Sequence, residues 1–168
     1  MSQFGADLWV LNRNPEPGFY VDLGCHDGEE ISNTKLLDEK GWNGICIDPF
    51  PTNFENRVGK VVKACVYSFE DIELVFDYSK EASALSGISD ELGVHKRHMY
   101  TNTTIEKHTF KTRTLESILD ECEAPKNIEY LNIDIEGAEL KFYELSLFIS
   151  IHLNSYLVNI ILNNPSVT

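Results

Sequence analysis

The chain has 168 residues, the length of one ordinary domain, and 42% of them are hydrophobic, which is enough to bury a core. Its formal net charge of −13 repels phosphate backbones, and no stripe of lysine and arginine offsets that repulsion. We therefore expect no nucleic-acid partner, and anionic membrane surfaces are disfavoured for the same reason.

The cysteines and the apolar runs predict a cytoplasmic protein. No apolar run reaches the roughly 20 residues that cross a bilayer, and the first residues carry no secretory signal pattern. The four cysteines form no CxxC pair, and three of them lie in or beside expected strands, so we expect buried, reduced thiols. A redox role for Cys25 is the disfavoured alternative.

In chain order, the expected elements alternate strands with helices. An N-terminal segment, residues 1–18, ends in a loop with two prolines. It is followed by a strand (19–23), a helix (30–40) and then strands at 44–47, 61–66, 72–78 and 109–113. Thr114 is expected to cap a helix at 115–121, which precedes a strand (128–135) and a helix (138–148). Because parallel neighbours need a crossover, this order predicts an α/β domain with a mostly parallel sheet and helices on both faces.

Two segments depart from the alternation within this single expected domain. Residues 79–108 are polar and lack a clear period, so we expect an irregular insertion or lid. The tail, residues 148–168, contains one candidate strand at 155–162. If that strand has an unpaired edge, it invites association, for example as a homodimer.

Three acidic motifs stand at the carboxyl ends of expected strands, the edge at which open α/β sheets bind ligands. In VDLGCHDG, Asp22 precedes a turn whose Gly24 and Gly28 let the backbone approach a ligand closely. Asp48 ends the next strand, 26 residues after Asp22, at a spacing suited to an acid that accepts ribose hydroxyls. The third motif, IDIEGAE, places Asp134 near the end of an expected strand, from which the chain passes into an expected helix.

The glycine spacing and the charge favour a cofactor without phosphate. The turn has the pattern Gly24-x-x-x-Gly28, and His26 replaces the middle glycine that admits a pyrophosphate in dinucleotide-binding domains. Acidic side chains crowd the expected helix start, where each close pair with a phosphate would cost roughly 1 kcal/mol or more. S-adenosylmethionine carries a sulfonium and an ammonium group but no phosphate, so the pattern favours it over NAD(P).

The same stretches resemble one enzyme family. YVDLGCHDG, CIDPFP and LNIDIEGAE are similar to successive signatures of the FkbM family of S-adenosylmethionine-dependent methyltransferases, and TRTLESIL resembles a further segment of it. The similarity covers about residues 19–145. Asp48 stands where glutamate is commoner in that family, and the tail does not resemble its C-terminal part. The resemblance implies a Rossmann-like class I methyltransferase fold whose C-terminal strands are incomplete here.

The resemblance also implies roles for individual residues. The implied cofactor-binding residues are Asp22, Gly24, Cys25, His26, Gly28, Asp48, Pro49, Tyr67 and Asp134. Asp22 and Gly24 would shape the methionine end, Asp48 would hold the ribose, and Tyr67 would flank the adenine. The implied activity is methyl transfer to a small-molecule or sugar hydroxyl. Its general base is expected to be Asp134, with His26 and Glu136 as alternatives.

Several of these features have plainer explanations. Asp22 could cap a turn, and the Asp-Pro step at Asp48 could be an ordinary strand-ending turn. His95 and His98, with His108, lack the cysteines or the HExxH pattern of a zinc site, so we expect no metal. Two other functions stay open: an incomplete, non-catalytic domain that acts through partner binding, and an NAD(P)-dependent oxidoreductase. The missing glycine and the acidic helix start disfavour the oxidoreductase.

Overall fold

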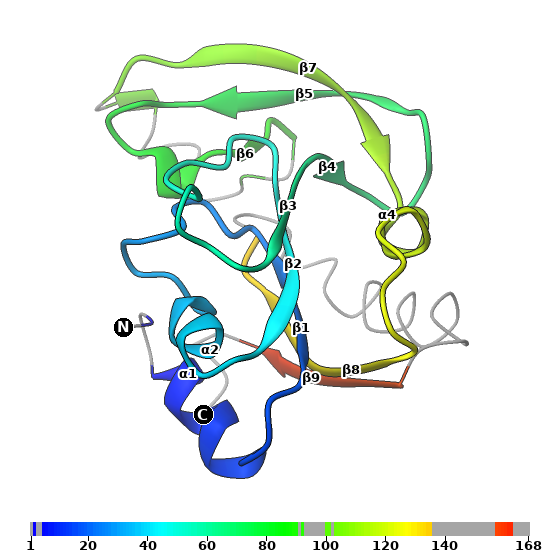
Figure 1. Cartoon of the computed structure of the whole chain (residues 1–168). Coiled ribbons are helices and arrows are strands. Elements are labelled where there is room, and N and C mark those ends of the chain that lie inside the picture. Colours follow the sequence, from blue (N-terminus) through cyan, green and yellow to red (C-terminus); the bar gives the residue numbers. More distant parts are fainter. Residues whose placement is uncertain are drawn as a thin grey trace.

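A computed structural model of the chain describes residues 2, 5–90, 92, 100–101, 103–135 and 157–162. Its strands form one sheet of five strands and one of four. In Figure 1, β5 and β7 of the smaller sheet run across one end of the molecule, while α1 and α2 lie on one side of the larger sheet and α4 on the other. Across the described residues, no helix is long and apolar enough to cross a membrane.

The larger sheet is entirely parallel in its described pairings. It contains β1 (Phe19–Leu23), β2 (Asn43–Asp48), β3 (Lys60–Lys63), β8 (Asn127–Ile133) and β9 (Leu157–Leu162). Their spatial order is β3-β2-β1-β8-β9, so the strand order reverses between β1 and β8. Open α/β sheets bind ligands at the carboxyl ends of strands beside such a reversal. The fold therefore points to the end of β1 as the place for a site.

Helices cover both faces of this sheet, as the sequence predicted. Strand residues alternate between faces, so Tyr20 faces one side and Val21 the other. On the first side, α1 (Ala6–Arg13) and α2 (Lys35–Glu39) lie over a buried cluster formed by Val10, Tyr20, Cys25, Leu37, Trp42, Cys46 and Tyr130. On the other side, α4 (Leu115–Glu121) contributes Leu115, Ile118 and Leu119 to a cluster with Val21, Leu23, Ile45, Ile47, Leu131 and Ile133.

The smaller sheet was not predicted as a separate layer. It contains β4 (Cys65–Val66), β5 (Glu73–Tyr78), β6 (Gly87–Ile88) and β7 (Glu106–Arg113), in the order β4-β7-β5-β6. The single strand expected at 61–66 is in fact β3 and β4, because the chain leaves the larger sheet after Lys63 and joins β7. β7 begins at Glu106, so the expected insertion supplies its first residues and the whole of β6.

The helices differ from the prediction at the N-terminal side. No helix was expected in the N-terminal segment, residues 1–18, but α1 lies there, and its buried Asp7 accepts hydrogen bonds from the backbone and hydroxyl of Ser2. The helix expected at 30–40 begins only at Lys35, because Ile31 has a φ of +57°, which a right-handed helix does not contain. Thr114 caps α4 as predicted, and its side chain accepts from the Ser117 amide.

The remaining predictions fall partly outside the described residues. The tail strand expected at 155–162 is β9, which pairs with β8. The helix expected at 138–148, Glu136, His95 and His98 all lie outside the described residues. The expected buried thiols are confirmed for Cys25, Cys46 and Cys65, which are free cysteines, while free Cys122 is half-buried.

Candidate functional site

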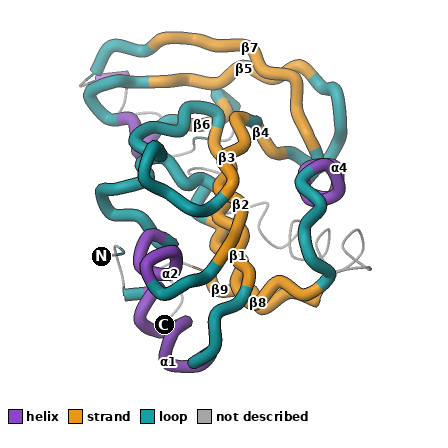
Figure 2. The backbone as a smooth tube through the Cα atoms, viewed as in Figure 1, coloured by secondary structure: helices purple, strands orange, loops and turns teal. Residues whose placement is uncertain are grey.

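Two loops leave the carboxyl ends of β1 and β2 and are bonded to each other. They are residues 24–34 and 49–59, drawn mainly as teal loop tube around β2 in Figure 2. The Gly28 amide donates to the Thr52 carbonyl at 2.8 Å, and the Thr52 amide donates to the His26 carbonyl at 3.0 Å. These two backbone hydrogen bonds fix the first loop against the second, although the loops contain little regular structure.

Gly24 brings the ends of β1 and β8 into contact. It has a φ of +77°, a conformation that glycine adopts at low cost. A Cβ at this position would overlap the backbone oxygen of Asp134 and lie 2.8 Å from its carbonyl carbon. The Asp134 amide donates to the Leu23 carbonyl at 2.9 Å, which continues the ladder beyond the strand. The absence of a side chain at Gly24 therefore places Asp134 directly beside the turn.

Asp48 presents a carboxylate at the end of β2, between the two loops. Its Oδ2 accepts from the His26 amide at 3.0 Å and its Oδ1 accepts from the Phe50 amide at 2.7 Å. Burial raises the pKa of Asp48 above its ordinary value, and the bonds from Phe50 and His26 only partly offset this. A carboxylate has about four lone-pair positions, so acceptor capacity remains for two hydroxyl groups.

A pocket opens between this edge of the larger sheet and the smaller sheet. The predicted site residues that line it are Gly24, His26, Asp48, Pro49, Tyr67 and Asp134. They come from the ends of β1, β2 and β8 and from the segment after β4. Apolar side chains of β5, including Phe76, lie across the pocket from that edge.

The family is decided by sequence comparison. The family model for the methyltransferase FkbM domain matches residues 22–147, which include all six predicted residues in the pocket wall. The chain belongs to the FkbM methyltransferase family. The resemblance inferred from the three motifs is thereby confirmed. No curated protein and no solved structure matches the chain significantly.

An aromatic cluster, which sequence reasoning missed, forms one side of the pocket of this FkbM domain. Phe50 stacks on Tyr78 with ring centroids 4.3 Å apart, and it meets the edges of His108 at 4.8 Å and Phe110 at 5.4 Å. Phe76 lies 5.7 Å from the Phe50 centroid. The cluster joins the β2 end to β5 and β7, so its members are far apart in sequence. The only local signal was the phenylalanine that follows Asp48-Pro49.

The expected insertion reaches the glycine turn through one side-chain contact. His26 Nε2 and Ser83 Oγ are 2.8 Å apart, and both residues line the pocket. Ser83 begins η1 (Ser83–Leu85), the short 3-10 helix of the insertion. Part of the segment expected to act as a lid thus does stand at the pocket of the FkbM domain.

A buried acid in β5 ties the insertion to the smaller sheet. Asp77 accepts from the hydroxyls of Ser89 and Tyr100, the latter at 2.7 Å, and it pairs with Lys107 at 3.2 Å. Burial acts to raise the pKa of Asp77, but these three partners outweigh it and hold the pKa below its ordinary value. Two points of the insertion, Ser89 and Tyr100, are therefore held by one carboxylate.

Asp22 requires a correction, because it does not line the pocket of the FkbM domain. Its side chain points into the sheet interior, and the residue is 1% exposed. There it accepts from Thr34 Oγ1 and from Asn132 Nδ2, each at 2.8 Å. Burial raises the pKa of Asp22 to about 6 despite these bonds. Cys25 and Gly28 are also outside the pocket lining.

Proposed function

We propose that this FkbM domain has a Rossmann-like class I methyltransferase fold, takes S-adenosylmethionine as methyl donor and methylates a hydroxyl group of a small molecule or sugar. The observation that carries the proposal is the Asp48 carboxylate, which is oriented by two backbone amides and lines one pocket with Gly24 and Asp134. The strand order β3-β2-β1-β8-β9 supports the fold assignment.

The residues present suit the donor. Asp48 has acceptor capacity for both ribose hydroxyls, and Gly24 lines the same pocket, where the methionine end would lie. Asp48 and Asp134 supply negative charge to the pocket, which favours a sulfonium and opposes a phosphate. Tyr67, which follows β4, would cover the adenine together with the apolar lining residues Ala64 and Val66. When bound, the donor supplies a methyl group that its sulfonium already activates.

The protein's own task is then to align the acceptor, exclude water and take up a proton. Transfer to a hydroxyl would form an oxygen–carbon bond, break the sulfur–methyl bond of the donor with S-adenosylhomocysteine as the leaving group, and release the hydroxyl proton, which needs an acceptor in the pocket. We assign that role to the side chain of Asp134, a residue of the pocket wall whose backbone carbonyl lies beside Gly24, and keep His26 as the alternative. The aromatic cluster around Phe50 helps to exclude water from this space.

Calorimetric titration with S-adenosylhomocysteine tests the donor assignment. Asp48→Asn places an NH₂ group where the carboxylate accepted, and a charged hydrogen bond contributes about 1.5–3 kcal/mol, so affinity should fall about tenfold or more. Asp71→Asn makes the same chemical change at an exposed residue and should leave affinity unchanged. A folded wild-type protein that binds no S-adenosylhomocysteine at high micromolar concentration would contradict the proposal.

A mass-spectrometric screen with S-adenosylmethionine tests the reaction. Neutral sugars and small hydroxylated compounds should gain one methyl group, and Asp134→Asn should lower kcat while affinity for S-adenosylhomocysteine stays close to wild type. If Asp134→Asn keeps full kcat and replacement of His26 by Gln abolishes it, the base assignment passes to His26.

A further inference from the structure

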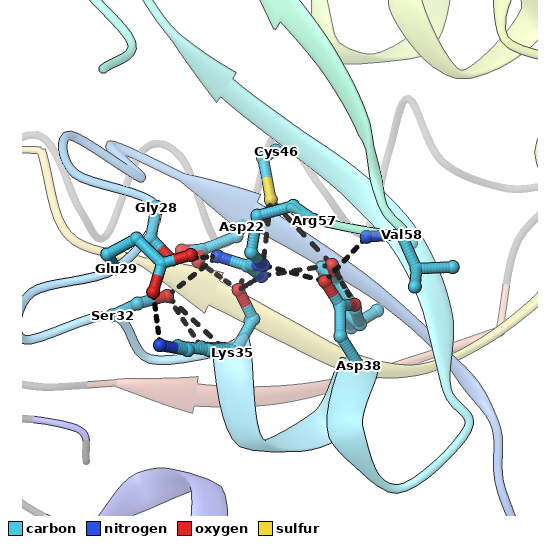
Figure 3. A network of polar contacts seen from close by, with 12 residues as sticks. Asp22, Gly28, Glu29, Ser32, Lys35, Asp38, Cys46, Arg57 and Val58 are labelled. Carbon is cyan, nitrogen blue, oxygen red and sulfur yellow. Dashed lines mark hydrogen bonds and ion pairs between the residues drawn. The ribbon is translucent and has the colours of Figure 1, made fainter. Parts of the chain in front are cut away.

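The polar contacts behind the pocket converge on one arginine (Figure 3). Arg57 lies in the loop between β2 and β3, and its side chain is only 2% exposed. Its Nε donates to Oδ2 of Asp38, an α2 residue whose side chain is 5% exposed, at 2.6 Å. This is a buried ion pair, and a buried arginine needs partners for its other donors as well.

Those other donors reach the loop that follows β1. Nη1 donates to the Gly28 carbonyl at 2.8 Å and to Ser32 Oγ at 3.0 Å, while Nη2 donates to Thr34 Oγ1 at 2.9 Å. Nη2 also lies 3.2 Å from the hydroxyl of Tyr20 in β1. One guanidinium group therefore connects β1, the loop at 24–34 and α2, and Figure 3 labels three of its partners, Gly28, Ser32 and Asp38.

The contacts of Arg57 bear on the site because one of them is to Gly28. Gly28 closes the turn that Gly24 opens, and its amide is already bound by Thr52 of the second loop. Arg57 binds the carbonyl of the same residue, so the second loop holds Gly28 through both its amide and its carbonyl. Between the two glycines lies His26, whose amide orients Asp48. Contacts at Gly24 and at Gly28 therefore hold the backbone of this turn at both of its ends.

We propose that Arg57 is a positioning residue of the methyl-donor site. It holds the turn at Gly28 and Ser32, and through the turn it keeps the His26 amide in place to orient the Asp48 carboxylate. As far as the donor is concerned, this inference rests on the proposed function.

The competing explanation is that Arg57 serves stability alone, as the partner of Asp38. The chain offers a matched pair of variants to separate the two. Asp38→Asn breaks the ion pair but leaves the bonds from Arg57 to Gly28 and Ser32. Arg57→Met keeps an unbranched apolar stem as far as the position of Nε and removes every donor. Arg57→Lys returns one cation to Asp38 but lacks the planar fork that reaches several acceptors at once.

The experiment compares urea unfolding with calorimetric titration of S-adenosylhomocysteine for all three variants. Arg57→Met and Asp38→Asn should both lower the urea midpoint. Only Arg57→Met should weaken affinity about tenfold or more, and Asp38→Asn should weaken it less than about threefold. Arg57→Lys should recover more of the urea midpoint than of the affinity. Equal loss of affinity in Arg57→Met and Asp38→Asn, or wild-type affinity in Arg57→Met, would overturn the inference.

Hydrogen exchange supplies a readout that needs no donor. The amides of residues 26–32 should exchange faster in Arg57→Met than in Asp38→Asn, since only the first variant releases the turn. Arg57→Lys should show the same excess if the methionine variant does not fold. If the wild type binds no S-adenosylhomocysteine, the proposed function fails, and this comparison still decides the inference: equal exchange in the two variants overturns it.

Discussion

Gly24 is the position at which one added methyl group has the most predictable effect. Gly24→Ala forces a side chain into a residue with φ +77°, and the new Cβ overlaps the Asp134 carbonyl. The left-handed conformation costs alanine about 1–2 kcal/mol. Relief of the overlap requires the ends of β1 and β8 to separate, which breaks the 2.9 Å bond from the Asp134 amide to Leu23. A buried, unsatisfied backbone pair adds about 1–3 kcal/mol.

Gly41→Ala is the matched control for this prediction. Gly41 has a φ of +84°, but the nearest atom to a Cβ there is Pro17 Cγ at 3.7 Å, an ordinary contact. It should therefore show the conformational cost without the overlap. Urea unfolding followed by tryptophan fluorescence should place Gly24→Ala about 1–3 kcal/mol below Gly41→Ala. Equal free energies of unfolding for the two variants would refute the close approach of β1 and β8.

Three further predictions concern groups away from that contact. The pKa of Asp22 is about 6 in the folded chain and has its ordinary value of 3.8 in the unfolded chain, so wild-type stability falls as pH rises through that window. Asp22→Asn lacks this loss, so its free energy of unfolding should rise by about 3 kcal/mol relative to that of wild type between about pH 3 and pH 7. If the difference in free energy of unfolding between variant and wild type does not change with pH, the burial of the carboxyl group is contradicted. Asp77→Asn should speed proteolytic cleavage within residues 79–105. Acid should have the same effect on wild type, because the pKa of Asp77 is lowered and its hydrogen bonds weaken only when the pH falls through that pKa. Cleavage of the variant at the wild-type rate would show that Asp77 does not hold the insertion. Thr114→Ala should lower the free energy of unfolding by about 1 kcal/mol, since the bond from the Ser117 amide is lost, and unchanged urea unfolding would count against the cap.

The centre of the larger sheet was predictable because β1, β2 and β8 are buried on both faces. β1, β2 and β8 are short apolar runs, and such runs mark interior strands without any knowledge of their partners. The capping of α4 by Thr114 was equally local, since the capping side chain and the Ser117 amide that donates to it are three residues apart. In both cases the deciding interaction lies within a few residues of the signal.

The smaller sheet was not predictable by the same means. β4 and β6 have two residues each, too few for any period to be visible. β5 and β7 pair Glu73 with Lys111 and Tyr78 with Glu106, so their register depends on contacts across the whole insertion. The predicted start of α2 was wrong for another reason. Ile31 has a positive φ, and helix propensity does not reveal such a value.

Within the site, the sequence identified the edge of the sheet but not the direction of each side chain. Asp22 lies before the end of β1, and its register partner in β8 is Asn132. An asparagine inside an otherwise apolar run was the available sign that a buried polar group needed a partner there. That sign was visible in the sequence, yet only the parallel register shows that Asp22 is the partner.

Access, more than the number of hydrogen bonds, separates the structural acid from the candidate ligand-binding one. Asp22 and Asp48 each accept two hydrogen bonds from the protein. Asp22 is sealed beneath the loop, where Thr34 links it to Arg57 and thereby to the only buried ion pair described behind the turn. Asp48 is held by backbone amides from one side and faces the pocket on the other. A donor with two hydroxyl groups can therefore reach Asp48, whereas at Asp22 it would first have to displace the bonds that keep β1, β8 and the turn together.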